Sequence, residues 1–272
     1  MKRIITFALA LTMLLVATLS FTSCGQTDDW KTVQERGYFY CGITVYAPMN
    51  YYDDETGDLI GFDTEFATAV AEYLGVEAKF ATINWPNKYT ELESGAIDLI
   101  WNGFTYGEEK DGVSRTEYVD FTYAYLENRQ CLVTKADRVS ELNSADALKG
   151  KNAVAEGGSS GEALAVTLTD EAKVTTFTSQ ANALMEVKAG NADFAIIDYQ
   201  MAKAMVGQGD YADLAINEAI NPESEVYAIG CRKGSTLTEK INEAIVALYE
   251  NGTLAQIAEK YGLTNDMVTE FK

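Results

Sequence analysis

The sequence predicts an α/β protein of two lobes, each a mainly parallel sheet flanked by helices, with two strands joining the lobes as a hinge. Short apolar runs alternate with amphipathic helical stretches, and this order is typical of parallel sheets covered on both faces. The alternation occurs twice along the chain. Two further strands and the last helices lie outside both series, which predicts that the second lobe is inserted into the first.

The first series starts near Tyr38 and predicts strand, helix, strand, helix and strand. In the first helix, apolar side chains recur at helical spacing and Gly75 follows as a C-terminal cap. In the second helix, Pro86 suits the first turn and Gly95 suits the end. The predicted elements are 39–44, 62–75, 78–83, 86–95 and 96–103.

The second series repeats this order over 151–158, 159–168, 173–177, 179–190 and 192–198. Three residue pairs match between the series at a constant spacing: Glu91 with Glu186, Gly95 with Gly190, and Asp98 with Asp193. A repeated architecture explains the match, although a generic turn from helix to strand would produce part of it by chance.

Two strand-like segments, 129–135 and 225–233, flank the second series, and helical stretches follow the latter. We therefore expect lobe one to comprise 37–130 and 228–272, and lobe two to comprise 131–227. A ligand is expected in the cleft between the lobes, beyond the carboxyl ends of the parallel strands.

The N-terminus has the features of an export signal over 1–23: Lys2 and Arg3, an apolar run, and small residues before Cys24. We interpret Cys24 as a lipidated N-terminus that tethers the protein to the membrane, followed by a linker over 24–36. An uncleaved anchor helix is the alternative. Both interpretations place the remainder of the chain outside the cytoplasm.

The formal net charge is −20 and the 21 Lys and Arg residues are scattered, which argues against nucleic-acid binding. The absence of histidine excludes Ser-His-Asp and Cys-His catalysis and removes the commonest transition-metal ligand. No metal or cofactor is expected. Cys41, Cys131 and Cys231 are predicted to be buried thiols, with a single bridge between Cys131 and Cys231 as the alternative.

A set of segments, in their order and spacing, resembles the polar amino-acid family of periplasmic binding proteins over 37–262. They are YAPMNY from Tyr46, GDLIGFDTEFATAVAEYLGV from Gly57, NW at Asn84, SGAIDLI from Ser94, SRTEYVDFTYAY from Ser114, LKGKNAVAEGGSSGE from Leu148 and NGTLAQIAEKYG from Asn251. The resemblance implies the two-lobed periplasmic-binding-protein fold and a monomeric, non-enzymatic component of an ABC importer that binds a free amino acid and delivers it to a membrane permease. A dehydratase for arogenate or prephenate on the same scaffold, and a sensor subunit, are the alternatives.

The resemblance also implies which residues bind the ligand. Arg115, placed before Asp120 and Phe121 as in the family, would hold the ligand α-carboxylate, because a guanidinium binds a carboxylate through two hydrogen bonds and stays charged. The loop before Arg115 is longer than is usual in the family, and a solvated surface arginine is the alternative. Asp198 would accept the α-ammonium group, or else cap the helix that follows.

Backbone N–H groups at Gly158, Ser159 and Ser160 open the first helix of lobe two and suit an anion, although an ordinary serine cap is the alternative. The weaker candidates Asn102, Gly103 and Thr105 are analogous on lobe one. Gly103 corresponds to Asp198 in the internal match.

Tyr46 and Trp85 align with the aromatic pair that encloses the ligand side chain in the family, although either could belong to the core. The family frequently has an acidic residue three positions before this tyrosine, whereas this chain has Ile43 there. This difference argues against a basic ligand and favours a neutral amino acid.

Overall fold

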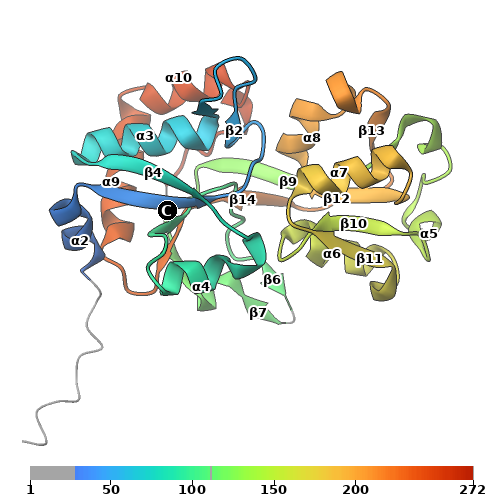
Figure 1. Ribbon diagram of the computed structural model, residues 1–272, viewed down its shortest axis with the longest axis horizontal. Helices are drawn as coiled ribbons and strands as arrows, with labels where there is room; N and C mark the ends of the chain where they lie inside the picture. Colours follow the sequence, from blue (N-terminus) through green and yellow to red (C-terminus); the bar gives the residue numbers. More distant parts are fainter. Residues whose placement is uncertain (1–27, 111, 272) are drawn as a thin grey trace, which may run out of the picture.

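The computed structural model describes residues 28–110 and 112–271, which fold into two lobes side by side (Figure 1). The two-lobed α/β architecture is therefore confirmed. The predicted signal peptide and Cys24 lie outside the described residues. Within them, no helix is both long and apolar enough to span a bilayer.

Lobe one is built on a sheet with the strand order β4-β1-β5-β15-β8. Its strands are β1 (Tyr38–Ile43), β4 (Glu77–Thr82), β5 (Leu99–Ile100), β8 (Val119–Phe121) and β15 (Gly230–Arg232). Helices α3 (Phe62–Leu74) and α10 (Thr253–Lys260) cover one side of this sheet and α4 (Lys88–Glu93) the other (Figure 1), while α9 (Leu237–Glu250) packs against α3 and α10.

Lobe two has the strand order β11-β10-β12-β9-β13. Its strands are β9 (Leu126–Lys135), β10 (Ala153–Glu156), β11 (Val174–Phe177), β12 (Phe194–Asp198) and β13 (Leu214–Asn217). Its helices are α5 (Ala145–Leu148), α6 (Ser160–Leu168), α7 (Gln180–Ala189) and α8 (Tyr199–Met205). Helix α6 lies on one side of the sheet, and α7 and α8 lie on the other (Figure 1).

Both sheets are mixed rather than simply parallel. In lobe one, β1 is parallel to β4 and β5, whereas β15 is antiparallel to β5 and β8. In lobe two, β10 is parallel to β11 and β12, whereas β9 is antiparallel to β12 and β13. Within these two sheets, every antiparallel pair includes β15 or β9. Both strands lie next to the points where the chain crosses between the lobes, and a chain that arrives from the other lobe enters the sheet from the opposite end.

A two-stranded ribbon joins the lobes. The first half of β9 pairs with β14 (Ser224–Tyr227), and only the second half joins the sheet of lobe two. The chain leaves the lobe-one sheet after Phe121 and re-enters it at Gly230. The expected boundary between 130 and 131 falls inside β9, and the exact lobe boundaries stay a prediction.

Helix α3 illustrates how the sequence pattern becomes packing. Phe62, Phe66 and Val70 recur at helical spacing and are fully buried against the core of lobe one. Gly75 ends the helix at φ 74°, where its N–H bonds the carbonyl groups of Ala71 and Glu72. A left-handed backbone is inexpensive only for glycine, so this cap stops the helix where the sequence predicts.

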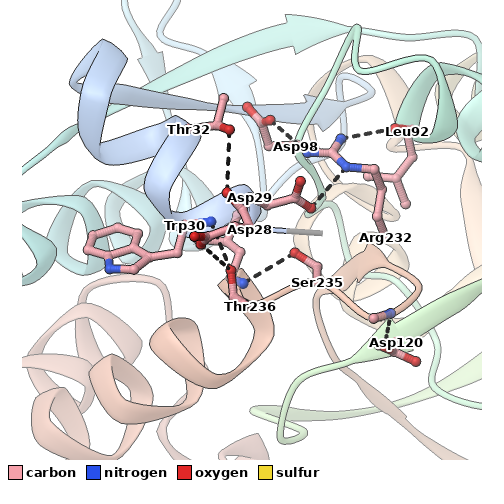
Figure 2. A network of polar contacts seen from close by, with 12 residues as sticks. Asp28, Asp29, Trp30, Thr32, Leu92, Asp98, Asp120, Arg232, Ser235 and Thr236 are labelled. Carbon is pink, nitrogen blue, oxygen red and sulfur yellow. Dashed lines mark hydrogen bonds and ion pairs between the residues drawn. The ribbon is translucent and has the colours of Figure 1, made fainter. Parts of the chain in front are cut away.

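The segment expected as a linker contains helix α2 (Asp29–Arg36), which docks on lobe one. Val33 is fully buried, and the Trp30 N–H donates to Thr236 Oγ1 at 3.1 Å. Figure 2 shows Arg232 reaching from β15 to the carboxylates of Asp29 and Asp98, at 3.0 and 3.1 Å. The N-terminal helix is therefore held on lobe one by residues at the point where the chain has returned to that lobe.

Cys41, Cys131 and Cys231 are buried free thiols, as the first of the two alternatives predicted. A bridge between the latter two is not formed, because Cys131 lies in the lobe-two sheet and Cys231 in the lobe-one sheet. The remaining strands pair as short hairpins, β2 (Tyr51–Tyr52) with β3 (Leu59–Ile60) and β6 (Glu109–Lys110) with β7 (Val113–Ser114). Short 3₁₀ helices span Trp85–Asn87, Arg115–Glu117, Ala136–Arg138, Glu171–Lys173, Gly209–Tyr211 and Thr264–Asp266.

Candidate functional site

A small pocket lies between the lobes and has a volume of about 10 Å³. Its walls combine polar residues from both lobes: Trp85, Asn102, Gly103, Thr105 and Arg115 from lobe one, and Glu156, Ser159, Ser160, Gln180 and Asp198 from lobe two. A second cavity of about 550 Å³ shares Arg115 and Ser159 with it and also touches Gly158. The fold therefore brings most of the predicted ligand-binding residues to one place.

Arg115 begins a 3₁₀ turn that follows the β6–β7 hairpin, and this residue is only 7% exposed. Its Nη1 donates to the carbonyl oxygen of Thr105 at 3.0 Å, and its guanidinium lies 4.8 Å from the ring centre of Phe104. These contacts orient the side chain. Because a guanidinium has five N–H donors, it can hold a ligand carboxylate in addition to Thr105.

Asp198 ends β12, and its carboxylate receives hydrogen bonds from three side-chain amides. Oδ1 accepts from Asn128 Nδ2 at 2.8 Å and from Gln130 Nε2 at 2.6 Å, and Oδ2 accepts from Gln180 Nε2. Although Asp198 occupies the N-cap position of α8, its side chain does not cap that helix. Burial raises the pKa of this carboxyl, while the amide bonds act in the opposite direction.

The first turn of α6 is closed by a reciprocal cap. Ser159 Oγ accepts from the Glu162 N–H at 3.1 Å, and Glu162 Oε2 accepts from the Gly158 N–H at 2.7 Å. The serine-cap interpretation of Ser159 is therefore confirmed, and the Gly158 N–H is already bonded within the cap. Ser160 Oγ instead donates to Thr105 Oγ1 at 3.1 Å, which links the two lobes.

The end of β5 places two of the weaker candidates on the lobe-one wall. Asn102 Nδ2 donates to Thr44 O at 2.9 Å and to Asn50 Oδ1 at 2.7 Å, so its amide mainly holds the chain in place. Gly103 has φ 56°, and a Cβ there would lie 2.8 Å from the Tyr46 ring and 3.1 Å from the Tyr227 ring. Only glycine fits between these rings.

Only one residue of the predicted aromatic pair lines the small pocket. Trp85 lines the small pocket and meets Phe104 edge-on, with ring centres 5.6 Å apart. Tyr46 is not a lining residue of either cavity: it packs behind Gly103, and its hydroxyl lies 2.7 Å from that of Tyr227. The enclosure of a ligand side chain by this pair stays a prediction.

Glu156 is a pocket residue that the sequence interpretation missed. It ends β10, is 3% exposed, and its Oε1 has no hydrogen-bond partner within the described residues. Burial, followed by the nearby charge of Asp198, raises the pKa of Glu156 to about 8. Its place at the carboxyl end of a predicted strand, as for Asp198, was the available signal.

A third carboxylate lies behind Asp198. Glu225 on β14 accepts through Oε1 from two of the three amides that hold Asp198, those of Asn128 and Gln130, at 2.5 and 2.8 Å. Burial and the charge of Asp198 raise the pKa of Glu225 to about 7. Across residues 28–110 and 112–271, no cluster of three or more Cys, Asp or Glu side chains is arranged to hold a metal ion.

The pocket therefore places a cation on one wall and carboxylates on the other. Arg115 projects from lobe one, and Asp198 and Glu156 project from lobe two. Such opposed charges suit a small molecule that carries both a carboxylate and an ammonium group, held across the gap between the lobes.

Comparison with known proteins agrees with this arrangement. Residues 41–264 match the model of the bacterial extracellular solute-binding proteins, family 3. The chain is 29% identical over 250 residues to the L-cystine-binding protein TcyJ of Escherichia coli (strain K12), covering 91% of each chain. It is 28% identical over 254 residues to the arginine-binding extracellular protein ArtP of Bacillus subtilis (strain 168), covering 92% of this chain and 96% of ArtP.

A crystal structure of the substrate-binding protein of an ABC uptake transporter from Streptococcus pneumoniae, with bound histidine, superposes with a TM-score of 0.79 and 31% identity. The superposition covers 90% of this chain and 99% of that protein. The three relatives thus bind different amino acids. This chain belongs to the bacterial extracellular solute-binding proteins of family 3, among whose members are the amino-acid-binding components of ABC importers.

Proposed function

We propose that this chain binds a free amino acid in the small pocket and delivers it to the membrane permease of an ABC importer. The observation that carries the proposal is the opposition of Arg115 and Asp198 across one pocket. The ligand α-carboxylate would bind the guanidinium, and the α-ammonium would bind the carboxylate of Asp198. Both are charge-assisted hydrogen bonds, which are stronger than neutral ones.

Binding requires the lobes to separate and close again. A pocket of about 10 Å³ has space for about one water molecule, so an amino acid enters when the lobes move apart. Several contacts link the lobes in this closed arrangement: Ser160 donates to Thr105, Lys88 Nζ donates to the Gly158 carbonyl at 3.0 Å, and Lys203 pairs with Asp266 at 2.7 Å. A ligand that contacts both walls would stabilise closure, and the permease would recognise the closed form.

The family is extracellular, so the chain acts outside the cytoplasm. We further propose that a lipid on Cys24 holds it at the membrane and that it acts as a monomer. Mass spectrometry of the mature N-terminus tests the anchor: diacylglyceryl-Cys24 is expected, and an intact Met1 or an unmodified Cys24 would refute it.

The binding experiment is a calorimetric titration of the mature protein, unfolded and refolded to remove bound ligand, with each common amino acid in turn. We expect a 1:1 response to one or a few of them, lost in Arg115→Ala. The control is Arg129→Ala, because Arg129 stacks on Tyr199, 4.0 Å from its ring centre, and does not line the pocket. A folded protein that responds to none of them would refute the proposal.

One observation favours a second candidate function. A dehydratase acting on arogenate or prephenate needs a general acid in the cleft, and Glu156 is a buried carboxyl with a raised pKa in that position. The relatives named above are binding proteins, so we rank this function second. Incubation with either compound, followed by chromatography of the dehydrated and decarboxylated product, distinguishes the two functions.

A further inference from the structure

The two carboxylates of the pocket differ in how many hydrogen bonds they receive from the protein. Asp198 receives hydrogen bonds from the amides of Asn128, Gln130 and Gln180. Glu156 lines the same pocket and is only 3% exposed. Its Oε1 nevertheless has no hydrogen-bond partner within the described residues. A buried acceptor without a partner is costly, so this oxygen is suited to receive a donor from a ligand.

The charges around Glu156 indicate what kind of donor fits. Asp198 on β12 disfavours its ionised form, whereas Lys88 on α4 and Arg115 favour it. Glu225 adds a further carboxylate behind Asp198, and Glu108 lies beside Arg115. A zwitterion with a neutral side chain would satisfy Arg115 and Asp198 but would bring no positive charge to Glu156. A ligand with a cationic side chain would place a positive charge beside Glu156 as well.

We propose that Glu156 is a specificity-determining residue that binds the cationic side chain of a basic amino acid. This inference rests on the proposed function and concerns the same pocket. It departs from the neutral ligand expected from Ile43, because Ile43 is 1% exposed in the core of lobe one and is not a lining residue of the pocket. Ile43 therefore makes no direct contact with a ligand side chain in this pocket, and its apolar character does not decide the charge of the ligand.

Proton exchange provides a readout that a purely structural role would not change. A cationic ligand keeps Glu156 ionised in the closed pocket, whereas a neutral ligand adds no positive charge to those of Lys88 and Arg115 and leaves the pKa of the buried carboxyl near 8. At pH 7, binding of a cationic ligand should release about one proton more than binding of a neutral ligand. The substitution Glu156→Gln should abolish this difference.

The experiment compares lysine and arginine, whose side chains are cationic at pH 7, with glutamine and leucine by calorimetry, in two buffers of different ionisation enthalpy. The variants are wild type, Glu156→Gln and, as a charge-matched control, Glu218→Gln at an exposed position of lobe two. We expect wild type to prefer a cationic ligand by about tenfold or more, and Glu156→Gln to lose about tenfold in affinity for that ligand. Glu218→Gln should bind like wild type.

A wild type that binds neutral amino acids more tightly, or a Glu156→Gln variant that keeps its affinity for cationic ligands within about threefold, would overturn the inference while leaving the proposed function intact. Silence with all amino acids would instead reject the proposed function itself. If Glu156→Gln does not fold, the proton difference measured on wild type decides: equal proton release for cationic and neutral ligands overturns the inference.

Discussion

The two lobes contain the same turn from helix to strand, with different surroundings. In lobe one, Gly95 adopts φ 78° after α4, and Asp98 accepts from the Tyr40 N–H at 2.7 Å. In lobe two, Gly190 adopts φ 80° after α7, and Asp193 accepts from the Asn152 N–H at 2.8 Å. Each aspartate thus ties the turn to the strand beside it, which gives the internal sequence match a structural meaning.

The difference lies in the cations that these aspartates meet. Asp98 has a side chain that is 4% exposed and pairs with both Arg36 and Arg232, which are far apart in the sequence. Asp193 is 20% exposed and pairs with Arg138 at 2.7 Å. Lobe one gathers both ends of the described chain, so the same turn carries a larger structural role there.

The lobes also differ at the pocket. At the position where lobe two has Asp198, lobe one has Gly103, whose N–H donates at 2.8 Å to Asp63. Each lobe buries one carboxyl with an unpartnered oxygen among the described residues, Asp63 in lobe one and Glu156 in lobe two. Only Glu156 lines the pocket. The repeat therefore conserves the scaffold, while the binding groups are particular to each lobe.

The comparison predicts its largest effect at the paired aspartates. Asp98→Ala would leave the partly buried Arg36 without its carboxylate and Arg232 with that of Asp29 alone, and should lower the free energy of unfolding by about 4 kcal/mol. Asp193→Ala removes a more exposed pair and should cost about 1–2 kcal/mol. Urea unfolding of the two variants measures the difference, and equal losses would contradict the distinction between the lobes.

The next effect is a pH dependence that separates Asp63 from Glu156. Burial raises the pKa of Asp63 from 3.8 to about 7, so the native state binds more protons than the unfolded state between these values. The stabilisation from this group is complete below pH 3.8 and is lost as the pH rises toward 7. Asp63→Asn should therefore stabilise the protein at pH 8 by on the order of 3 kcal/mol, with little change at pH 4.

Denaturant unfolding across pH 4–8 tests this expectation. The proton release on ligand binding should stay that of wild type in Asp63→Asn and change in Glu156→Gln. A stability profile of Asp63→Asn that is parallel to that of wild type would exclude a raised pKa for Asp63.

A smaller effect is expected at the glycines of lobe one. Gly103→Ala meets both a left-handed backbone and the rings of Tyr46 and Tyr227, and should cost about 2–3 kcal/mol and weaken binding. Gly95→Ala has a similar φ of 78° but no atom within 4 Å of the new Cβ, and should cost about 1 kcal/mol. Thermal unfolding compares them, and an equal shift would mean that the rings move aside.

The smallest effect concerns the link between the lobes. Ser160→Ala removes the 3.1 Å hydrogen bond to Thr105 and should weaken ligand affinity by about fivefold, equivalent to about 1 kcal/mol. The melting temperature without ligand should change little. Small-angle scattering should detect a larger radius of gyration if closure is impaired, and unchanged affinity would show that this bond does not stabilise the closed form.

The sequence alone predicted the strands and helices that have strong periodicity, and it placed Arg115, Trp85 and Asp198 in a common site through the resemblance. It missed helix α2, whose docking depends on Arg232 and Thr236 far along the chain. It also missed Glu156 and Gln180. Glu156 lies within the segment from Leu148 that carries the resemblance, but both residues come close to Asp198 only through the arrangement of β10, β12 and α7 in lobe two.

Local patterns determined the two series of strands and helices, because apolar periodicity and glycine caps act over a few neighbouring residues. Tertiary structure decided which carboxylates face the pocket and which lie behind it. Asp63 and Glu156 have the same chemistry in sequence, yet one lies in the core against Gly103 and the other beside Arg115 and Asp198. Burial and neighbouring charge arise from residues distant along the chain, so only the folded protein distinguishes the two.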